Sequence, residues 1–183
     1  MVSAQMNNTS LQFQQLEVNL KRLQGRLPDL PVSSVLLTRM IQNLGRVMSS
    51  MLEQEIRPFG LAEVEFRVLT TLFSQPDGCA HPTELCARTS QSPANMSRIS
   101  DALVSRDLIT RVSSMHDRRK MVLRITEQGE DLVRRLLPTL FGPLREMFKD
   151  FSEEAQQQLI VQLKHLGSML DQVMSHHFAE RVE

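Results

Sequence analysis

Residues 108–126 read LITRVSSMHDRRKMVLRIT, and this stretch decides the fold. β-Branched and apolar residues in 108–112 and 121–126 predict two paired strands, and the charged tip Asp117-Arg118-Arg119 predicts an exposed connection between them. Immediately upstream, residues 92–98 (SPANMSR) open a helix. A helix that fits a major groove, followed by a hairpin with arginines at its tip, is typical of proteins that read duplex DNA.

The helix that opens at residue 92 carries small and polar residues on its outer face. Ser92 is the expected N-cap, and Pro93 is the expected first helical residue. Asn95 is the residue type that bonds adenine bidentately, and Arg98 suits guanine or a phosphate. The DNA contacts expected from this helix are Ser92, Ala94, Asn95, Ser97 and Arg98. An ordinary solvated face is the alternative for this helix alone, since polar outer faces are the rule.

The hairpin tip supplies a second group of expected DNA contacts, Asp117, Arg118 and Arg119. A wing tip approaches the minor groove, where narrow A·T-rich stretches attract arginine, so one of the two arginines is expected to enter it. Asp117 is placed to hold a guanidinium and to fix its direction. A solvated charged turn is the alternative, but the helix and the hairpin together, about twenty residues apart, favour DNA binding.

Charge is distributed unevenly along the chain. The 183 residues carry 21 basic and 21 acidic side chains, yet residues 88–126 hold eight Lys/Arg against three Asp, a local charge of +5. A basic face on a neutral protein is the electrostatic footprint expected of a duplex binder. The absence of Trp and Tyr argues against recognition of RNA or single strands, which relies on stacked aromatic rings.

Amphipathic helices are expected in the N-terminal part of the chain, because apolar residues recur there at steps of three and four. The recurrences run from Phe13 to Leu27, from Leu37 to Leu52 and from Val64 to Leu72. Ser33 or Ser34 is expected to cap the second of these helices.

Two more helices are expected in the C-terminal part. Glu127–Phe148 has the pattern of one long helix that Pro138 and Gly142-Pro143 bend or break. The last helix opens at Ser152 and carries a coiled-coil-like seam with steps of four, three, four and three. The seam residues are Leu159, Leu163, Leu166, Leu170 and Val173. We expect the seam to pack on a second copy in a two-fold homodimer; a helical adaptor that offers the seam to a foreign partner is the alternative.

The expected fold class is mainly α with a small β-hairpin wing, that is, a winged helix-turn-helix plus a helical dimerisation region. The expected DNA-binding domain is 61–129. The helical dimerisation region combines 33–60 with 130–183, and residues 1–32 form an N-terminal extension with an amphipathic helix.

No catalytic centre, metal site or cofactor is expected. The chain has no Gly-rich phosphate loop, no HExxH and no paired Cys spacing for zinc, so it is not expected to be an enzyme. Cys79 and Cys86 are expected to be reduced thiols of a cytosolic protein, and the alternative is a redox-sensing thiol. No apolar run reaches the ~20 residues of a membrane span and no secretory signal opens the chain, so a cytoplasmic location is expected.

Residues 60–129 also resemble the MarR family of winged helix-turn-helix regulators. The matching features occur in the family's order, although each alone is a weak motif. They are Leu69 with the turn after it, Pro82-Thr83-Glu84-Leu85, Ser97-Arg98 with Leu103, Leu108-Ile109-Thr110-Arg111, Asp117-Arg118-Arg119 and Leu123–Gly129. Residues 33–60 and the region of Leu137-Pro138 are similar to the multidrug-efflux repressor branch, the EmrR type.

The resemblance implies a homodimeric repressor that reads a pseudo-palindrome and is released by a small aromatic or lipophilic ligand, in efflux or stress response. It implies that Arg119 contacts the minor groove with Asp117 as its orienting partner, and that an effector pocket lies between the dimer helices and the DNA-reading lobe. The candidate pocket residues are Met40, Leu44, Met48, Phe66 and Leu69. Plain core packing is the alternative for each of these residues, and a redox-sensing regulator of the same fold is the alternative function.

Overall fold

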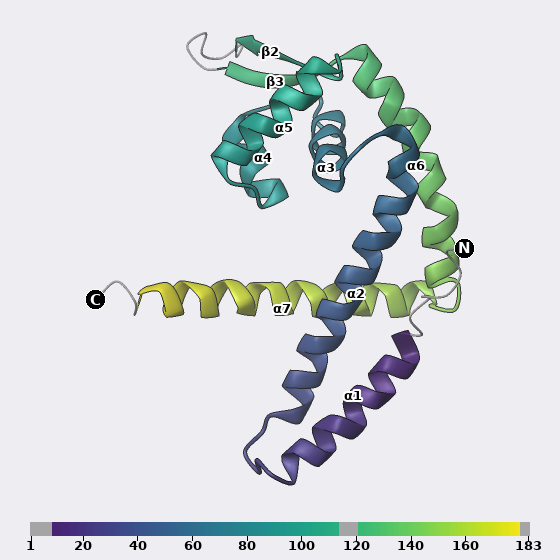
Figure 1. The fold of residues 1–183 in the computed structure, drawn as a ribbon, viewed down its shortest axis with the longest axis vertical. Helices are drawn as coiled ribbons and strands as arrows, with labels where there is room; N and C mark the ends of the chain where they lie inside the picture. Colours follow the sequence, from purple (N-terminus) through teal and green to yellow (C-terminus); the bar gives the residue numbers. More distant parts are fainter. Residues whose placement is uncertain (1–8, 114–120, 180–183) are drawn as a thin grey trace. The chain divides into compact units, whose positions relative to one another are not determined.

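The computed structural model describes residues 9–113 and 121–179 of the chain (Figure 1). The chain divides into two compact units, Met1–Leu136 and Leu137–Glu183. The described residues form mainly helices and a small antiparallel sheet of three strands. The expected fold class is therefore confirmed.

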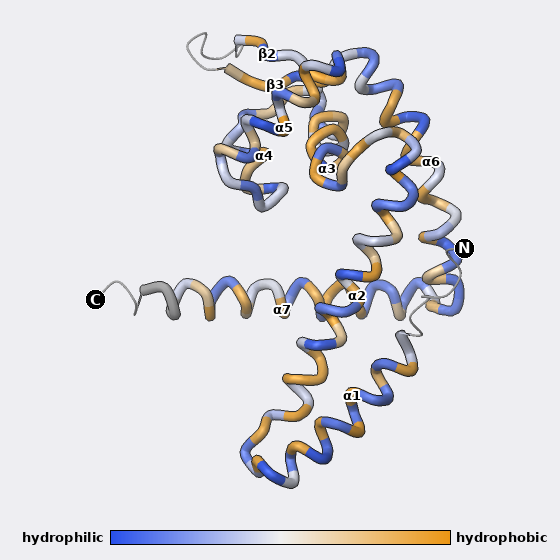
Figure 2. The backbone as a smooth tube through the Cα atoms, viewed as in Figure 1, coloured by the Kyte–Doolittle hydropathy of each residue, from blue (hydrophilic) through white to orange (hydrophobic). Residues whose placement is uncertain are grey.

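Two antiparallel-packed helices open the first unit, α1 (Thr9–Gln24) and α2 (Val32–Ile56), which lie side by side in Figure 1. Leu20 of α1 is buried, and the side-chain amide of Asn43 on α2 donates to Gln12 Oε1 on α1 at 3.0 Å. Apolar and polar residues alternate along both helices (Figure 2). The apolar periodicity thus predicted both helices correctly.

The start of α2 differs from the expectation. The helix begins at Val32, and its N-cap residue Pro31 makes no side-chain cap bond. The ring of Pro31 restricts φ, which is −76° here, and its carbonyl oxygen accepts from the N–H of Val35 at 3.0 Å. Ser33 and Ser34 therefore lie inside the first turn, and the prediction that one of them caps the helix is wrong.

A sharp turn separates α2 from the next helix. α2 continues into a short 3₁₀ helix, η1 (Arg57–Phe59), which Gly60 ends with a φ of +68°. This left-handed conformation favours glycine, which commonly ends helices in this way. α3 (Glu63–Phe73) then begins, and the Glu65 carboxylate accepts from the N–H of Ala62 at 2.8 Å.

The helix-turn-helix consists of α4 (Pro82–Thr89) and α5 (Pro93–Ser105). Ser90 ends α4 with a φ of +54°, and its N–H donates to the carbonyl oxygen of Cys86. The buried side chains of α3, α4 and α5 form the centre of the first unit's core. They include Val68, Leu69, Leu72, Leu85, Met96 and Leu103. This core orients α5 by its apolar face.

A small sheet follows α5. Asp107 takes a φ of +58° at the exit of the helix, a conformation that Asp tolerates better than most residues. β2 (Ile109–Ser113) and β3 (Met121–Ile125) then pair antiparallel as the expected hairpin. β1 (Cys79–Ala80) adds to the other side of β3, so the strand order is β1-β3-β2. The sequence did not predict β1, because two residues are too few to show an alternating pattern.

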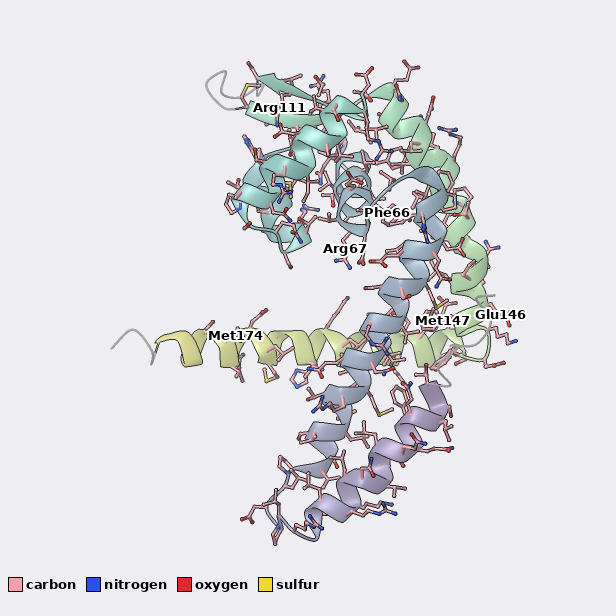
Figure 3. The ribbon with its side chains drawn as sticks, in the orientation of Figure 1. Phe66, Arg67, Arg111, Glu146, Met147 and Met174 are labelled. Carbon is pink, nitrogen blue, oxygen red and sulfur yellow. The ribbon has the colours of Figure 1, made fainter. Side chains whose placement is uncertain are left out.

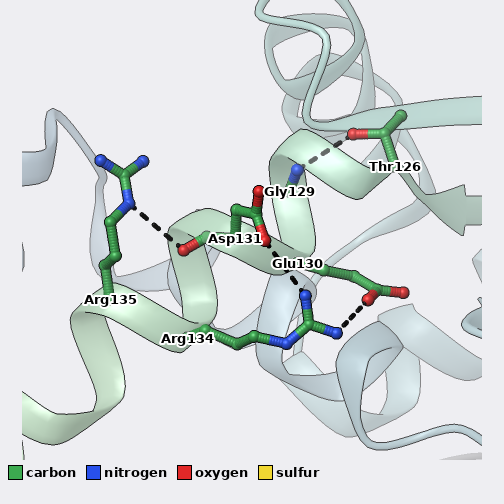
Figure 4. Close-up of polar contacts among 6 residues, drawn as sticks. All are labelled: Thr126, Gly129, Glu130, Asp131, Arg134 and Arg135. Atoms are coloured by element: carbon green, nitrogen blue, oxygen red, sulfur yellow. Dashed lines mark hydrogen bonds and ion pairs between the residues drawn. The ribbon is translucent and has the colours of Figure 1, made fainter.

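α6 (Glu127–Phe148) is fitted closely to the sheet at its first turn. The Thr126 hydroxyl accepts from the N–H of Gly129 at 3.0 Å (Figure 4). A Cβ added at Gly129 would collide with the carbonyl oxygen of Leu108 and would lie 2.8 Å from a side-chain carbon of Ile125. The close approach of helix and strand therefore requires glycine at this position.

α6 is continuous through Pro138 and Pro143, so of the bend or break expected there, the break does not occur. Each proline removes one backbone donor, yet the helix runs on to Phe148. The boundary between the two units falls between Leu136 and Leu137, one residue before Pro138.

α7 (Glu153–Ala179) forms most of the second unit. The last helix opens at Ser152 as expected, and the Ser152 hydroxyl caps it by accepting from the N–H of Ala155 at 3.2 Å. The expected seam is exposed within this unit, and Figure 2 shows the apolar residues recurring along the helix. Among the described residues, no helix combines the length and the apolar character that crossing a membrane requires.

Candidate nucleic-acid interface

One face of α5 is buried against the core, and the opposite face is exposed to solvent. Met96, Ile99 and Leu103 are buried on the inner face. The Ser92 hydroxyl oxygen accepts from the N–H of Asn95 at 3.3 Å and so caps the helix, as the sequence predicts. The buried residues and the cap together determine which side chains point outward.

The face of α5 opposite the core carries an outer stripe of exposed residues: Ala94, Ser97, Arg98 and Asp101. Their spacing of three or four residues aligns them on one side of the helix. Ser92, just ahead of them, is exposed as well. The short side chains of Ala94 and Ser97 leave room for a groove edge to approach the backbone, while Arg98 reaches farther out. The expected contact residues other than Asn95 therefore share an accessible face.

Asn95 lies beside the outer stripe and is half-buried. Its side-chain N–H donates to Gln91 Oε1 at 2.5 Å, and Gln91 in turn donates to the carbonyl oxygen of Thr89 at 3.0 Å. The amide group of Asn95 is thus engaged with the turn that precedes α5. Its contact with adenine stays a prediction.

Most described cations of the basic segment 88–126 are engaged within the protein. Arg88 forms an ion pair with Glu84 at 2.8 Å, and Arg111 forms one with Asp101 at 2.5 Å. Arg106 donates hydrogen bonds to the carbonyl oxygens of Phe59 and Gly60. Arg124 donates a hydrogen bond to Cys79. Arg98 makes no hydrogen bond or ion pair to any residue that the structure describes. The positive charge of α5 that is available to a ligand is therefore concentrated at Arg98.

The base of the expected wing is formed as predicted. β2 and β3 stay in register from Ile109 opposite Ile125 to Ser113 opposite Met121. Arg111 projects from β2 (Figure 3). The tip residues Asp117, Arg118 and Arg119 lie outside the described residues. Their DNA contacts stay predictions.

A cleft of about 580 Å³ opens beside α5, with a mostly apolar lining. Its walls come from α4, α5 and the strands β2 and β3. The lining includes Pro82, Cys86, Met96, Ser97, Arg111 and Leu123. This volume is within the range of small-molecule sites.

The residues proposed from sequence for an effector pocket lie elsewhere. Leu44 and Met48 are exposed on α2, and Met40 is half-buried there. Phe66, which is labelled in Figure 3, and Leu69 are buried on α3. None of these residues lines the cleft beside α5. Their role in ligand binding stays a prediction.

Cys79 of β1 faces a cation. Arg124 Nε donates to Cys79 Sγ at 2.9 Å, and the two residues are opposite each other in the sheet. The hydrogen bond to Cys79, together with the electrostatic interaction with the same side chain, raises the pKa of Arg124 above its ordinary value. In the described part of the chain, no group of three or more His, Cys, Asp or Glu side chains is suited to hold a metal ion.

A helix-turn-helix followed by a hairpin, with an exposed polar stripe on its second helix, defines the winged helix-turn-helix class of transcription regulators. A sequence model of the MarR family matches residues 59–120. The transcriptional repressor MprA of Escherichia coli K12 is 32% identical over 161 residues, which cover 88% of this chain and 92% of MprA. The chain therefore belongs to the MarR family.

Solved structures of MarR-family regulators share the fold. AbsC from Streptomyces coelicolor superposes with a TM-score of 0.67 at 24% identity, over 74% of this chain and 92% of AbsC. A point mutant of MarR from E. coli, solved in complex with operator DNA, has a TM-score of 0.65 at 22% identity, over 75% of this chain and 98% of the MarR chain.

Proposed function

We propose that this protein is a transcriptional repressor that binds pseudo-palindromic duplex DNA as a homodimer and is released by a small aromatic or lipophilic ligand. The observation that carries the proposal is the outer stripe of α5, where short side chains flank Arg98. The similarity to MprA, itself a repressor, supports the direction of regulation. We place the protein in the cytoplasm and assign it no enzymatic activity.

In the proposed complex, the N-terminal half of α5 enters the major groove. Ser97 and Arg98 then lie against base edges or phosphates. The wing tip approaches the adjacent minor groove through Arg119, which Asp117 orients. Residues 61–129 act as the DNA-binding domain.

The homodimer is supported by the apolar seam of α7. Its side chains are exposed within the second unit, and leucines at these spacings are rarely left in water along a whole helix. Residues 33–60 and 130–183 form the proposed dimerisation region, and 1–32 form an N-terminal extension. A two-fold dimer presents two copies of α5 to sites about 34 Å apart on one face of a duplex.

The cleft beside α5 supports regulation by a ligand. Ser97 belongs both to the cleft lining and to the outer stripe, so a molecule seated in the cleft would compete with the groove for the same helix. Two structural neighbours bind aromatic compounds: the DNA binding of BpsR of Bordetella bronchiseptica is regulated by 6-hydroxynicotinic acid, and CouR of Rhodococcus jostii was solved bound to p-coumaroyl-CoA. The residue set on α2 and α3 is the second proposed site.

The experiment that tests DNA binding starts from a pool of randomised duplexes. The wild-type protein is used to enrich binding sequences, and the enriched duplex is titrated with wild type, Arg98→Ala and Arg135→Ala. Arg98→Ala is expected to weaken binding by about 1–3 kcal/mol, whereas Arg135→Ala removes the same charge from α6 and leaves the affinity unchanged. Failure to enrich any sequence, or equal affinity of the two variants, would overturn the proposal.

A thiol-based regulator is the second candidate, and the contact between Arg124 and Cys79 favours it. The Cys79 thiolate would attack hydrogen peroxide, which yields a sulfenic acid and hydroxide and oxidises the sulfur. Cys79→Ser and Cys86→Ser separate the two thiols. If peroxide releases DNA from the double Ser variant as it does from wild type, this candidate is eliminated.

A further inference from the structure

Asp101 is an acidic residue on the face that α5 would turn toward DNA. It follows Arg98 by three positions and Ser97 by four, and 62% of its side chain is exposed. At 1.5 Å per residue it lies roughly 4.5–6 Å farther along the helix axis than these two residues. An isolated carboxylate at this place would be repelled by the phosphates that border the groove.

Arg111 neutralises this carboxylate. Its Nη2 lies 2.5 Å from Asp101 Oδ1, and 41% of the arginine side chain is exposed. The backbone of Arg111 is fixed in β2 opposite Leu123 of β3, so the guanidinium reaches α5 from a rigid base. Because both groups are solvated, the ion pair adds little to stability. The ion pair matters because it holds the positive charge of Arg111 at Asp101.

We propose that Asp101 is a specificity-determining residue, which withholds Arg111 from the phosphates of the duplex. This inference rests on the proposed function, duplex binding through α5. Affinity for any sequence grows with the number of phosphates that cations contact, whereas discrimination comes from base contacts. A cation held by Asp101 lowers binding to arbitrary DNA and leaves the contribution of the base contacts intact. The ratio of specific to non-specific affinity is thereby raised.

The test measures affinity for a mixed-sequence duplex as a function of salt for the full-length protein and its variants. Asp101→Asn removes the carboxylate but keeps the side-chain shape. It is expected to bind this duplex several-fold more tightly and to steepen the slope of log affinity against log salt by about 0.9, the value for one further phosphate contact. Its preference for the enriched duplex over the mixed one is expected to fall.

Two further variants assign the effect to Arg111. Arg111→Ala alone is expected to weaken binding to both duplexes, because it leaves the Asp101 carboxylate unpaired beside the phosphates. It is expected to keep the wild-type slope, because the wild-type arginine contacts no phosphate. In Asp101→Asn/Arg111→Ala the steeper slope is expected to disappear. Glu130→Gln is the matched control, since it removes one negative charge from the exposed Glu130–Arg134 pair on α6, and no change of slope is expected there (Figure 4).

The outcomes separate this inference from the proposed function. If wild type binds no duplex, the proposed function itself fails. Suppose that wild type binds but the slope is unchanged in Asp101→Asn, or becomes shallower by about 0.9 in Arg111→Ala alone. Either result contradicts the claim that Asp101 keeps Arg111 away from the phosphates, while duplex binding itself stands. If Asp101→Asn weakens binding to both duplexes, Asp101 contributes a favourable contact and the inference is overturned.

Discussion

Arg106 at the C-terminal end of α5 donates from Nη1 to the backbone carbonyl oxygen of Gly60 at 2.8 Å, although the two residues are 46 positions apart. Its Nη2 donates to the carbonyl oxygen of Phe59 at 3.2 Å, and the carboxylate of Glu65 lies 3.7 Å from Nη1. One guanidinium thus ties the end of the candidate recognition helix to the turn that joins α2 to α3. Arg106 belongs to the basic segment by sequence, yet its role in the fold is internal.

Arg106→Ala is expected to lower the free energy of unfolding by about 1–2 kcal/mol, because two carbonyl oxygens lose a charged donor. Arg106→Lys should recover only part of this loss, since an ammonium group cannot span both oxygens as a planar guanidinium does. Urea unfolding measures both variants. Arg88→Ala, which breaks an exposed pair on α4, serves as the control and should cost no more than about 0.5 kcal/mol. If Arg106→Ala lowers the free energy of unfolding no more than Arg88→Ala does, the contacts of Arg106 with the α2–α3 turn are not needed for stability.

Gly129→Ala and Gly142→Ala form a matched pair on α6. The added Cβ at Gly129 meets the carbonyl oxygen of Leu108, whereas at Gly142 nothing lies within 4 Å. We expect Gly129→Ala to destabilise the protein by about 1–3 kcal/mol through steric strain. Gly142→Ala should stabilise it by roughly 0.5–1 kcal/mol, because alanine favours the helix. Thermal unfolding of the two variants measures the sign of each change in Tm. Equal changes in Tm would contradict the close contact between Gly129 and Leu108.

Leu166→Asp is expected to turn the proposed dimer into monomers at micromolar concentration. Burying a leucine contributes about 1.5–3 kcal/mol, and a two-fold dimer loses two of them and gains two buried charges. Ser168→Asp adds the same charge on the opposite side of α7 and should leave the dimer intact. Sedimentation velocity distinguishes the two states. A Leu166→Asp protein that still sediments as a dimer would place the interface away from the seam.

The elements that were predicted from sequence carry strong local signals. Ser92-Pro93 marks the start of α5, and Asp107 marks its exit with a φ of +58°. The apolar residues of β2 and β3 and the regular stripes of the long helices likewise depend on neighbours within a few positions. Such signals are visible in a single sequence because the capping, turn or apolar residue lies within a few positions of the element that it determines.

The features that were not predicted depend on contacts between residues far apart in the sequence, or on how a helix accommodates a proline. β1 exists because Cys79 and Ala80 pair with β3, which lies more than forty residues later. α6 stays unbroken at Pro138 although proline removes a backbone donor there, and local rules could not decide between a bend and a break. The pair of Asp101 and Arg111 and the cleft beside α5 both arise where β2 meets α5. Arg111 follows Asp101 by ten residues in the next element, so no local pattern in the sequence indicates that the two side chains pair.

The central claim is that two copies of the outer stripe of α5 read one duplex. The most direct measurement is a stoichiometric titration of the enriched duplex, followed by sedimentation and repeated over a range of salt concentrations. The account predicts two chains per duplex and a linear fall of log affinity with log salt. One chain per duplex, or an affinity that does not change with salt, would contradict it.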